Sequence, residues 1–166
     1  MNKKNIIIFF LVLAGLFGMI WWGRGSQTSN SSGVQSKNKS QLTAVETFYD
    51  FGTISMTKGN VTRVFKVTNP TSEDVFVSSL TTSCMCTSAY INEPDGSKKG
   101  PFGMSGMGHV PPANEIIKAG ETRDIEVVYD PASHGPAGVG SIDRFVYLQD
   151  STGGIVQLEI RAQVTP

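Results

Sequence analysis

Two cysteines placed two positions apart, Cys84 and Cys86, are the residues of this sequence best suited to chemistry, and no other cysteine is present. On an extended chain, side chains at positions i and i+2 lie on one face, about 6.6 Å apart along the backbone. This separation is near the upper limit for a relaxed disulfide, so a bond between them would be strained and readily reduced. The spacing therefore predicts a labile disulfide or a pair of thiols.

A glycine-rich segment, residues 100–109, carries Met104, Met107 and His109. Methionine normally fills gaps in a protein core, but no regular element can carry these two side chains inward from among glycines. An exposed thioether in an oxidising compartment is open to oxidation unless it binds something. Thioether, thiolate and imidazole together form a soft ligand set that selects Cu(I), whereas structural zinc sites require four Cys or His ligands.

These two features together predict a soft-metal site. The expected ligands of one Cu(I) ion are Cys84, Cys86, Met104, Met107 and His109, with Met85 and His134 in reserve.

Three alternatives remain open. The cysteines can form an oxidised or buried structural pair. They can carry out thiol–disulfide chemistry, although the C-x-x-C at a helix N-terminus that lowers a thiol pKa is missing. Lastly, the domain can be a metal-free module that offers an edge strand or a loop to an envelope protein partner.

Charge and composition argue against an enzyme and against a nucleic-acid binder. The chain has 166 residues with 14 basic and 14 acidic side chains and only two histidines. A formal net charge of zero, without a run of either sign, lacks the electrostatic footprint of a nucleic-acid protein. No phosphate-binding glycine loop, paired-carboxylate arrangement or Ser/His/Asp set is visible. We expect no catalytic residues and no small-molecule substrate.

The N-terminus, residues 1–22, is predicted to be a signal anchor in the cell membrane. Lys3 and Lys4 precede an uncharged, mostly apolar run from Ile6 to Trp22, which as a helix would measure roughly 25 Å. The terminal tryptophan pair suits a membrane interface, and the lysines favour a cytoplasmic N-terminus. A single-pass protein with an extracytoplasmic C-terminal domain follows. If the segment is instead a cleaved signal peptide, the domain is secreted.

Residues 23–43 are dominated by Ser, Asn, Gln, Gly and Thr, which predicts a flexible linker because such a composition cannot form a core. The remaining residues, 44–166, show short runs of β-branched and aromatic residues bounded by turn residues, and helical spacing is absent. Long loops are expected at Asn92–Asn114 and Pro131–Gly140. The predicted strands cover residues 46–54, 61–68, 75–80, 88–91, 122–129, 142–148 and 156–164.

Strict alternation in the last run indicates one buried and one wet face. Val156, Leu158 and Ile160 point to one side, whereas Gln157 and Glu159 point to the other. This pattern is typical of antiparallel sheets. About seven strands with this spacing predict an all-β, immunoglobulin-like antiparallel β-sandwich, preceded by the transmembrane helix and without the Cys…Trp…Cys signature of antibody domains.

Four segments resemble a bacterial family called domain of unknown function 1573. They are YDFGTI at residues 49–54, VFKVTNP at 64–70, TSCMCT at 82–87 and IKAGE at 117–121. The resemblance extends over about residues 48–164, and Met85 stands where the family's S-C-G-C-T motif usually has glycine. It implies an exported, immunoglobulin-like domain related in architecture to the major-sperm-protein and ASH/HYDIN modules. The family supplies no established activity.

Overall fold

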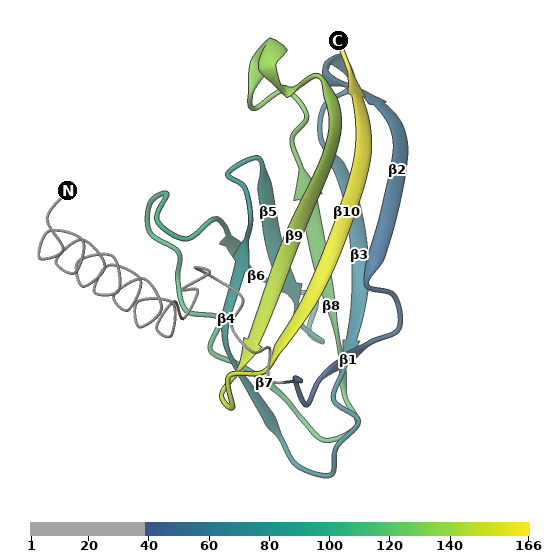
Figure 1. The fold of residues 1–166 in the computed structure, drawn as a ribbon. Helices are drawn as coiled ribbons and strands as arrows, with labels where there is room; N and C mark the ends of the chain where they lie inside the picture. Colours follow the sequence, from purple (N-terminus) through teal and green to yellow (C-terminus); the bar gives the residue numbers. More distant parts are fainter. Residues whose placement is uncertain (1–38) are drawn as a thin grey trace, which may run out of the picture. The chain divides into compact units, whose positions relative to one another are not determined.

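The computed structural model describes residues 39–166, which form a sandwich of two sheets (Figure 1). The predicted membrane anchor and residues 23–38 of the predicted linker lie outside the described residues. Within residues 39–166, no helix is long and apolar enough to cross a membrane.

Each sheet contains five strands. In spatial order, the first sheet consists of β1 (Thr43–Ala44), β3 (Val61–Thr68), β8 (Thr122–Tyr129), β5 (Thr87–Asn92) and β6 (Lys98–Phe102). The second consists of β2 (Phe48–Ser55), β10 (Ile155–Thr165), β9 (Gly140–Asp150), β4 (Val75–Thr82) and β7 (Glu115–Ile117). All neighbouring strands are antiparallel except β2 and β10, which are parallel. Two short 3-10 helices, η2 (Met56–Lys58) and η3 (Gly135–Gly138), complete the described part of the chain.

The all-β prediction is confirmed, and the predicted strands correspond to β2, β3, β4, β5, β8, β9 and β10 with small shifts at their ends. The alternation predicted for the last strand is also correct, because Val156, Leu158, Ile160, Ala162 and Val164 are all buried. A valine, leucine or isoleucine side chain stabilises the fold by about 1.5–3 kcal/mol when fully buried. The core therefore lies between the two sheets, as the period-two pattern requires.

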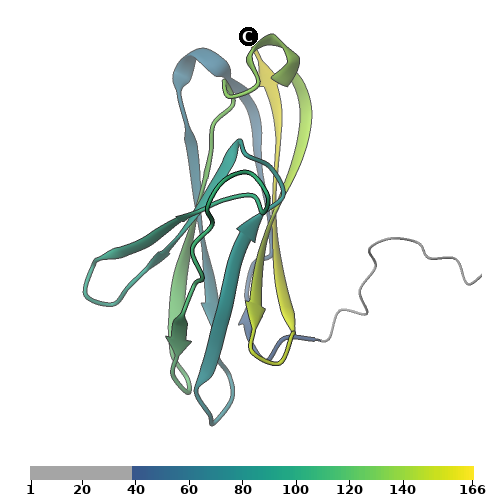
Figure 2. The same cartoon turned by 90° about the vertical axis from the view of Figure 1, so that its left-hand side faces the viewer.

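The prediction of a structureless loop from residue 92 to residue 114 is wrong. Its first part folds back as β6, which pairs with β5, and the hairpin projects from the body of the sandwich (Figure 2). The sequence of β6, KKGPF, contains a glycine and a proline, which normally interrupt strands. They are tolerated here because β6 is the edge strand of its sheet, where fewer backbone donors need partners. The second expected loop contains η3.

An ion-pair network joins the two sheets beside this hairpin. Glu115 of β7 and Arg123 of β8 are only 5% and 8% exposed, and the Arg123 Nε lies 2.8 Å from a Glu115 carboxylate oxygen. Lys99 of β6 approaches the other oxygen at 2.5 Å. Burial opposes the charge on Glu115, but hydrogen bonds from Lys99 and Arg123 outweigh it and lower the pKa of this carboxyl. The network thus fixes one edge of the second sheet to the first.

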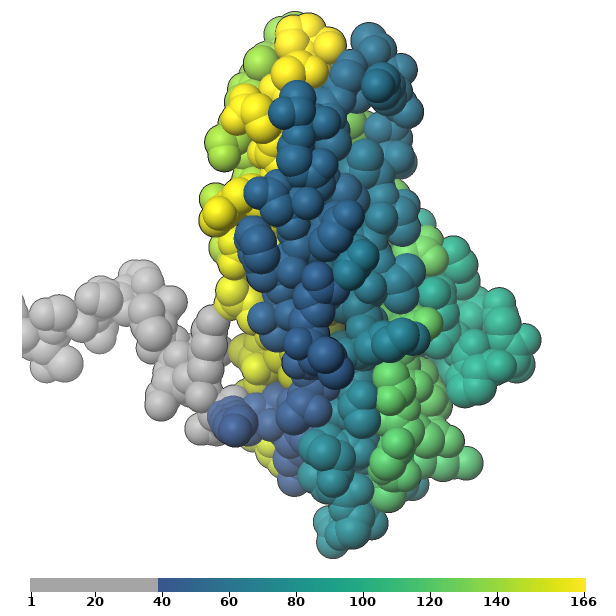
Figure 3. All heavy atoms as spheres, turned by 90° about the vertical axis from the view of Figure 1, so that its right-hand side faces the viewer, coloured from purple at the N-terminus to yellow at the C-terminus, as the bar shows by residue number. Residues whose placement is uncertain are grey.

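The opposite side of the sandwich is closed by β2, which lies between β10 and β3 at the surface (Figure 3). The guanidinium of Arg63 on β3 stacks 4.1 Å from the ring centre of Tyr49 on β2. Arg63 also forms an ion pair with Glu46, just before β2. These contacts hold β2 against a strand of the other sheet.

The chain enters the domain at the hairpin between β9 and β10. Lys39 forms a parallel bridge with Ile155, and Leu42 is buried in the core. The carboxylate of Asp150, 1% exposed, accepts hydrogen bonds from the Ser40 hydroxyl and the Gln41 amide. Residues 39–43, at the end of the predicted linker, therefore pack on the sandwich.

Candidate functional site

Cys84 and Cys86 lie in the turn that connects β4 to β5. Their Cα atoms are 5.3 Å apart, and the two sulfurs form a disulfide. The extended geometry predicted for this pair is wrong, because the Thr87 amide donates back to the Cys84 carbonyl and closes a turn. The buried hydroxyl of Thr82 lies 3.0 Å from the carbonyl oxygens of both Cys84 and Thr87 and shares its one hydrogen between them, which fixes the turn. The Cα separation lies well within the usual range for disulfides, so backbone spacing no longer predicts a strained bond.

His134 lies closest to the exposed side of the pair. Its Nε2 is 3.3 Å from the Cys84 sulfur. The side chain comes from the segment between β8 and η3, which is held in place because the Asp130 amide donates to the Cys86 carbonyl. The ligand atoms of Cys84, Cys86 and His134 all lie within 4.8 Å of one another. His134, predicted only as a reserve ligand, is thus the histidine that the fold brings to the cysteines.

Arg144 of β9 lies on the other sulfur. Its Nε donates to the Cys86 sulfur at 3.2 Å, while its Nη1 donates to the Asp143 carbonyl. The cysteine turn and β9 are held together because the Ser83 amide donates to the Phe145 carbonyl. Sequence reasoning did not identify Arg144, since an arginine in an alternating strand looks like any solvent-facing residue. Only the pairing of β4 with β9 places it beside the cysteines.

A shallow hollow of about 340 Å³ lies beside the two residues that contact the sulfurs. Both His134 and Arg144 line it, together with Val139, Ser141 and Ile142. Nearby, burial raises the pKa of the Tyr129 phenol, which Arg144 lowers only in part. The phenol therefore stays neutral at physiological pH, and Arg144 supplies the permanent charge beside the sulfurs.

The methionine loop begins beside the cysteine turn. Thr82 donates its amide to the Gly103 carbonyl and forms a parallel bridge with Met104, which is half-buried. Met107 is 55% exposed, and His109 is exposed as well. His109 is not part of the group of three residues formed by the cysteines and His134. Met85, between the cysteines, points outward and is 57% exposed.

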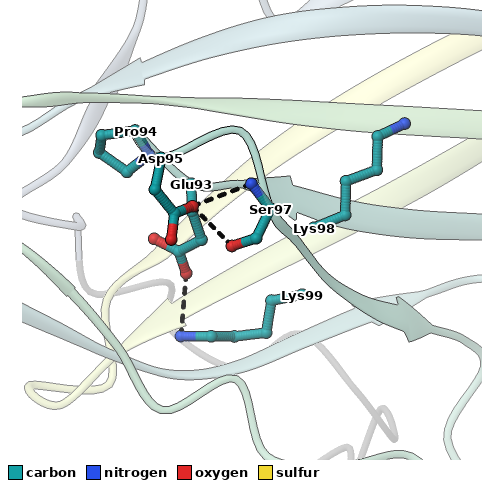
Figure 4. Close-up of a pocket in the computed structure, with 6 residues that line it drawn as sticks. All are labelled: Glu93, Pro94, Asp95, Ser97, Lys98 and Lys99. Atoms are coloured by element: carbon teal, nitrogen blue, oxygen red, sulfur yellow. Dashed lines mark hydrogen bonds and ion pairs between the residues drawn. The ribbon is translucent and has the colours of Figure 1, made fainter.

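A second hollow, of about 490 Å³, lies at the tip of the β5–β6 hairpin (Figure 4). Its polar groups already serve one another: Asp95 accepts from the amide and hydroxyl of Ser97, and Lys99 pairs with Glu93. This arrangement stabilises the hairpin turn and leaves no convergent set of free polar groups. The cysteine turn is therefore the candidate functional site.

The fold and the site together define an immunoglobulin-like β-sandwich with a Cys-x-Cys turn between two adjacent strands. A family described as protein of unknown function (DUF1573) matches residues 42–99, which include this turn. The resemblance inferred from the sequence is thus confirmed over that part of the chain.

Solved structures with the same kind of fold include a protein of unknown function from Porphyromonas gingivalis W83. It has a TM-score of 0.54 and 13% sequence identity over 81% of this chain, and the chain spans about half (51%) of that protein. An ASH/PapD-like domain of human CEP192 is similar with a TM-score of 0.48 and 12% identity, over 82% of this chain and 96% of that domain. No curated protein is significantly similar in sequence.

Proposed function

We propose that this protein is an extracytoplasmic binding module, tethered to the cell membrane by its N-terminal segment, that binds one Cu(I) ion and is not an enzyme. The ligands are the reduced thiolates of Cys84 and Cys86 and the imidazole of His134. One observation carries the proposal: the ligand atoms of these residues all lie within 4.8 Å of one another. Three ligands around an ion with bonds of about 2.3 Å lie about 4 Å apart, so small side-chain movements suffice.

The chemistry of this ligand set favours Cu(I). Thiolate sulfur and imidazole nitrogen are soft or borderline ligands, and three of them fall short of the four that structural zinc requires. Two thiolates and one Cu(I) carry a net charge of −1. The guanidinium of Arg144, 3.2 Å from the Cys86 sulfur, offsets this charge in a partly buried setting. The disulfide must be reduced first, because the thiolate is the form that binds a metal.

The methionine loop carries the other residues that the sequence predicts near the ion. Met104 starts the loop at a backbone bridge to Thr82, two positions before Cys84. Met107 and His109 are exposed and lie further along this loop. We propose that they cover the bound ion, as the sequence predicts, and that His134 is the nitrogen ligand.

Titration of the reduced, full-length protein with Cu(I) against a competing chelator tests the proposal. Removing both thiolates with Cys84→Ser and Cys86→Ser should abolish competition, and His134→Asn should weaken binding at least about tenfold. The matched variant His109→Asn should have a smaller effect, since this imidazole is outside the group of three. Circular dichroism would verify that each variant is folded. An affinity unchanged by the double cysteine substitution would rule out the copper site.

A second candidate function is metal-free binding to an envelope protein. The observation that favours it is the exposure of large apolar side chains beside the site, with Met85 at 57% and Val139 at 44%. Val139 lines the same hollow as His134. Deleting residues 103–109 separates the two functions: copper affinity should fall, whereas photo-crosslinking of a partner through position 85 should persist.

A further inference from the structure

The two sulfurs of the disulfide have different surroundings. The Cys86 sulfur belongs to a residue only 3% exposed and receives a hydrogen bond from Arg144. Cys84 is partly exposed, and its sulfur lies beside the exposed ring of His134. An attacking group from solvent therefore reaches Cys84 more easily than Cys86. The cation lies beside the sulfur that is harder to reach.

We propose that the disulfide is a polarised electron acceptor, which exchanges with an exogenous dithiol by attack at Cys84 and departure of Cys86 as a thiolate. Thiol–disulfide exchange is faster when the leaving sulfur is stabilised as an anion. The fixed positive charge of Arg144 provides this stabilisation through a charge-assisted hydrogen bond. The inference uses the same cysteines as the proposed copper site, but it holds whether or not copper binds.

The exchange proceeds in two steps. One thiolate of the dithiol attacks the Cys84 sulfur, the bond between Cys84 and Cys86 breaks, and the electron pair remains on Cys86. The second thiolate of the dithiol then attacks the dithiol sulfur that is bonded to Cys84, and Cys84 leaves as a thiolate. The dithiol becomes a disulfide after losing two electrons, and the protein gains them as two thiolates. Protons released by the dithiol are available to the new thiols.

The hollow lined by His134 and Arg144 leaves room for the attacking molecule. It has a volume of about 340 Å³ and is lined by His134, Val139 and Arg144. His134 and Arg144 also contact the sulfurs, so a small dithiol seated in the hollow is separated from the disulfide by these two side chains and reaches Cys84 past the exposed ring of His134. In this way reduction produces the thiolate pair that the proposed copper site requires.

The rate of reduction by dithiothreitol, measured on the oxidised full-length protein by quenching and alkylation, tests the role of Arg144. Arg144→Gln should slow reduction about tenfold, because the leaving sulfur loses its cation, and Arg144→Lys should restore most of the rate. The matched control is Arg63→Gln, since the charge of Arg63 is paired with Glu46, just before β2. Equal rates for Arg144→Gln and the wild type would overturn the proposal.

Trapping the mixed disulfide tests which sulfur is attacked. Brief exposure to glutathione, acid quenching and alkylation with N-ethylmaleimide should leave glutathione on Cys84 and maleimide on Cys86, which fragment mass spectra distinguish. Glutathione found mainly on Cys86 would reverse the proposed polarity. Cu(I) affinity is measured on chemically reduced protein, so it is independent of this result. If glutathione is found on Cys86 but Cu(I) affinity is normal, only the exchange proposal is contradicted. If glutathione is found on Cys84 but the protein has no Cu(I) affinity, only the copper site is contradicted.

Discussion

Replacing Asp150 by asparagine should loosen the join between the N-terminal segment and the β9–β10 hairpin. One carboxylate oxygen, Oδ2, accepts from the Ser40 hydroxyl at 2.7 Å and from the Gln41 amide at 3.1 Å. The other, Oδ1, accepts from Thr152 and from the Gly154 amide. An asparagine keeps a single oxygen, so its amino group must face the Gln41 N–H, donor against donor.

The size of the destabilisation follows from the two hydrogen bonds that the Oδ2 atom of Asp150 accepts. Hydrogen bonds to charged groups contribute about 1.5–3 kcal/mol each, and one of the two contacts can be partly replaced. We therefore expect Asp150→Asn to lower the free energy of unfolding at pH 7 by about 2–4 kcal/mol in urea denaturation. Asp95→Asn is the matched control, because Asp95 also accepts from a residue two positions on, Ser97, but in an exposed turn. It should remain close to the wild type.

The pH dependence gives a second readout of the same contacts. Burial opposes ionisation of Asp150, but hydrogen bonds from Thr152, Ser40 and two backbone amides outweigh it and lower the pKa of this carboxyl. Because the pKa is lower in the folded state than in the unfolded state, the stabilisation is present above about pH 4 and is lost as the pH falls through the lowered value. The difference in the free energy of unfolding between the wild type and Asp150→Asn should therefore become smaller as the pH is lowered. A gap that stays constant down to about pH 2, or a variant no less stable than the Asp95 control, would refute the reasoning.

Two further substitutions test the packing of the sandwich away from the cysteine turn. Gly154→Ala should destabilise the domain by about 1–3 kcal/mol in urea denaturation, because a Cβ there would lie 2.5 Å from the Ser40 Cα. Gly103→Ala is the control, since a Cβ at residue 103 meets nothing within 4 Å. Equal stability of the two variants would contradict this prediction. Glu115→Gln should lower the free energy of unfolding by about 3 kcal/mol, because the buried guanidinium of Arg123 loses the carboxylate of Glu115. Since salt screens buried pairs weakly, urea denaturation in 1 M salt should give nearly the same loss, and a loss that salt abolishes would show that the pair is exposed.

The strands could be predicted because their signal is local. In β10 every second residue is apolar, and burial follows this pattern from Val156 to Val164. The hairpin strand β6 could not be predicted in the same way, because its glycine and proline indicate a break and only its edge position makes them acceptable.

The site was predictable only in part. Cys84 and Cys86 stand out by type and spacing, and their closeness needs no tertiary information. The approach of His134 depends on how the segment after β8 returns over the turn, and that of Arg144 depends on the register between β4 and β9. Such long-range placements come from packing between elements, which leaves no periodic signal in the sequence.

The way in which the chain enters the domain has a mechanical consequence. A pull on the N-terminal side is transmitted through Lys39 and Ser40, and it loads the few hydrogen bonds around Asp150 before it reaches the ladder between β9 and β10. We expect these hydrogen bonds to break first under load. From Asp150 to Arg144 the strand β9 extends about 20 Å, so the contacts that we expect to break first lie far along this strand from the sulfur pair.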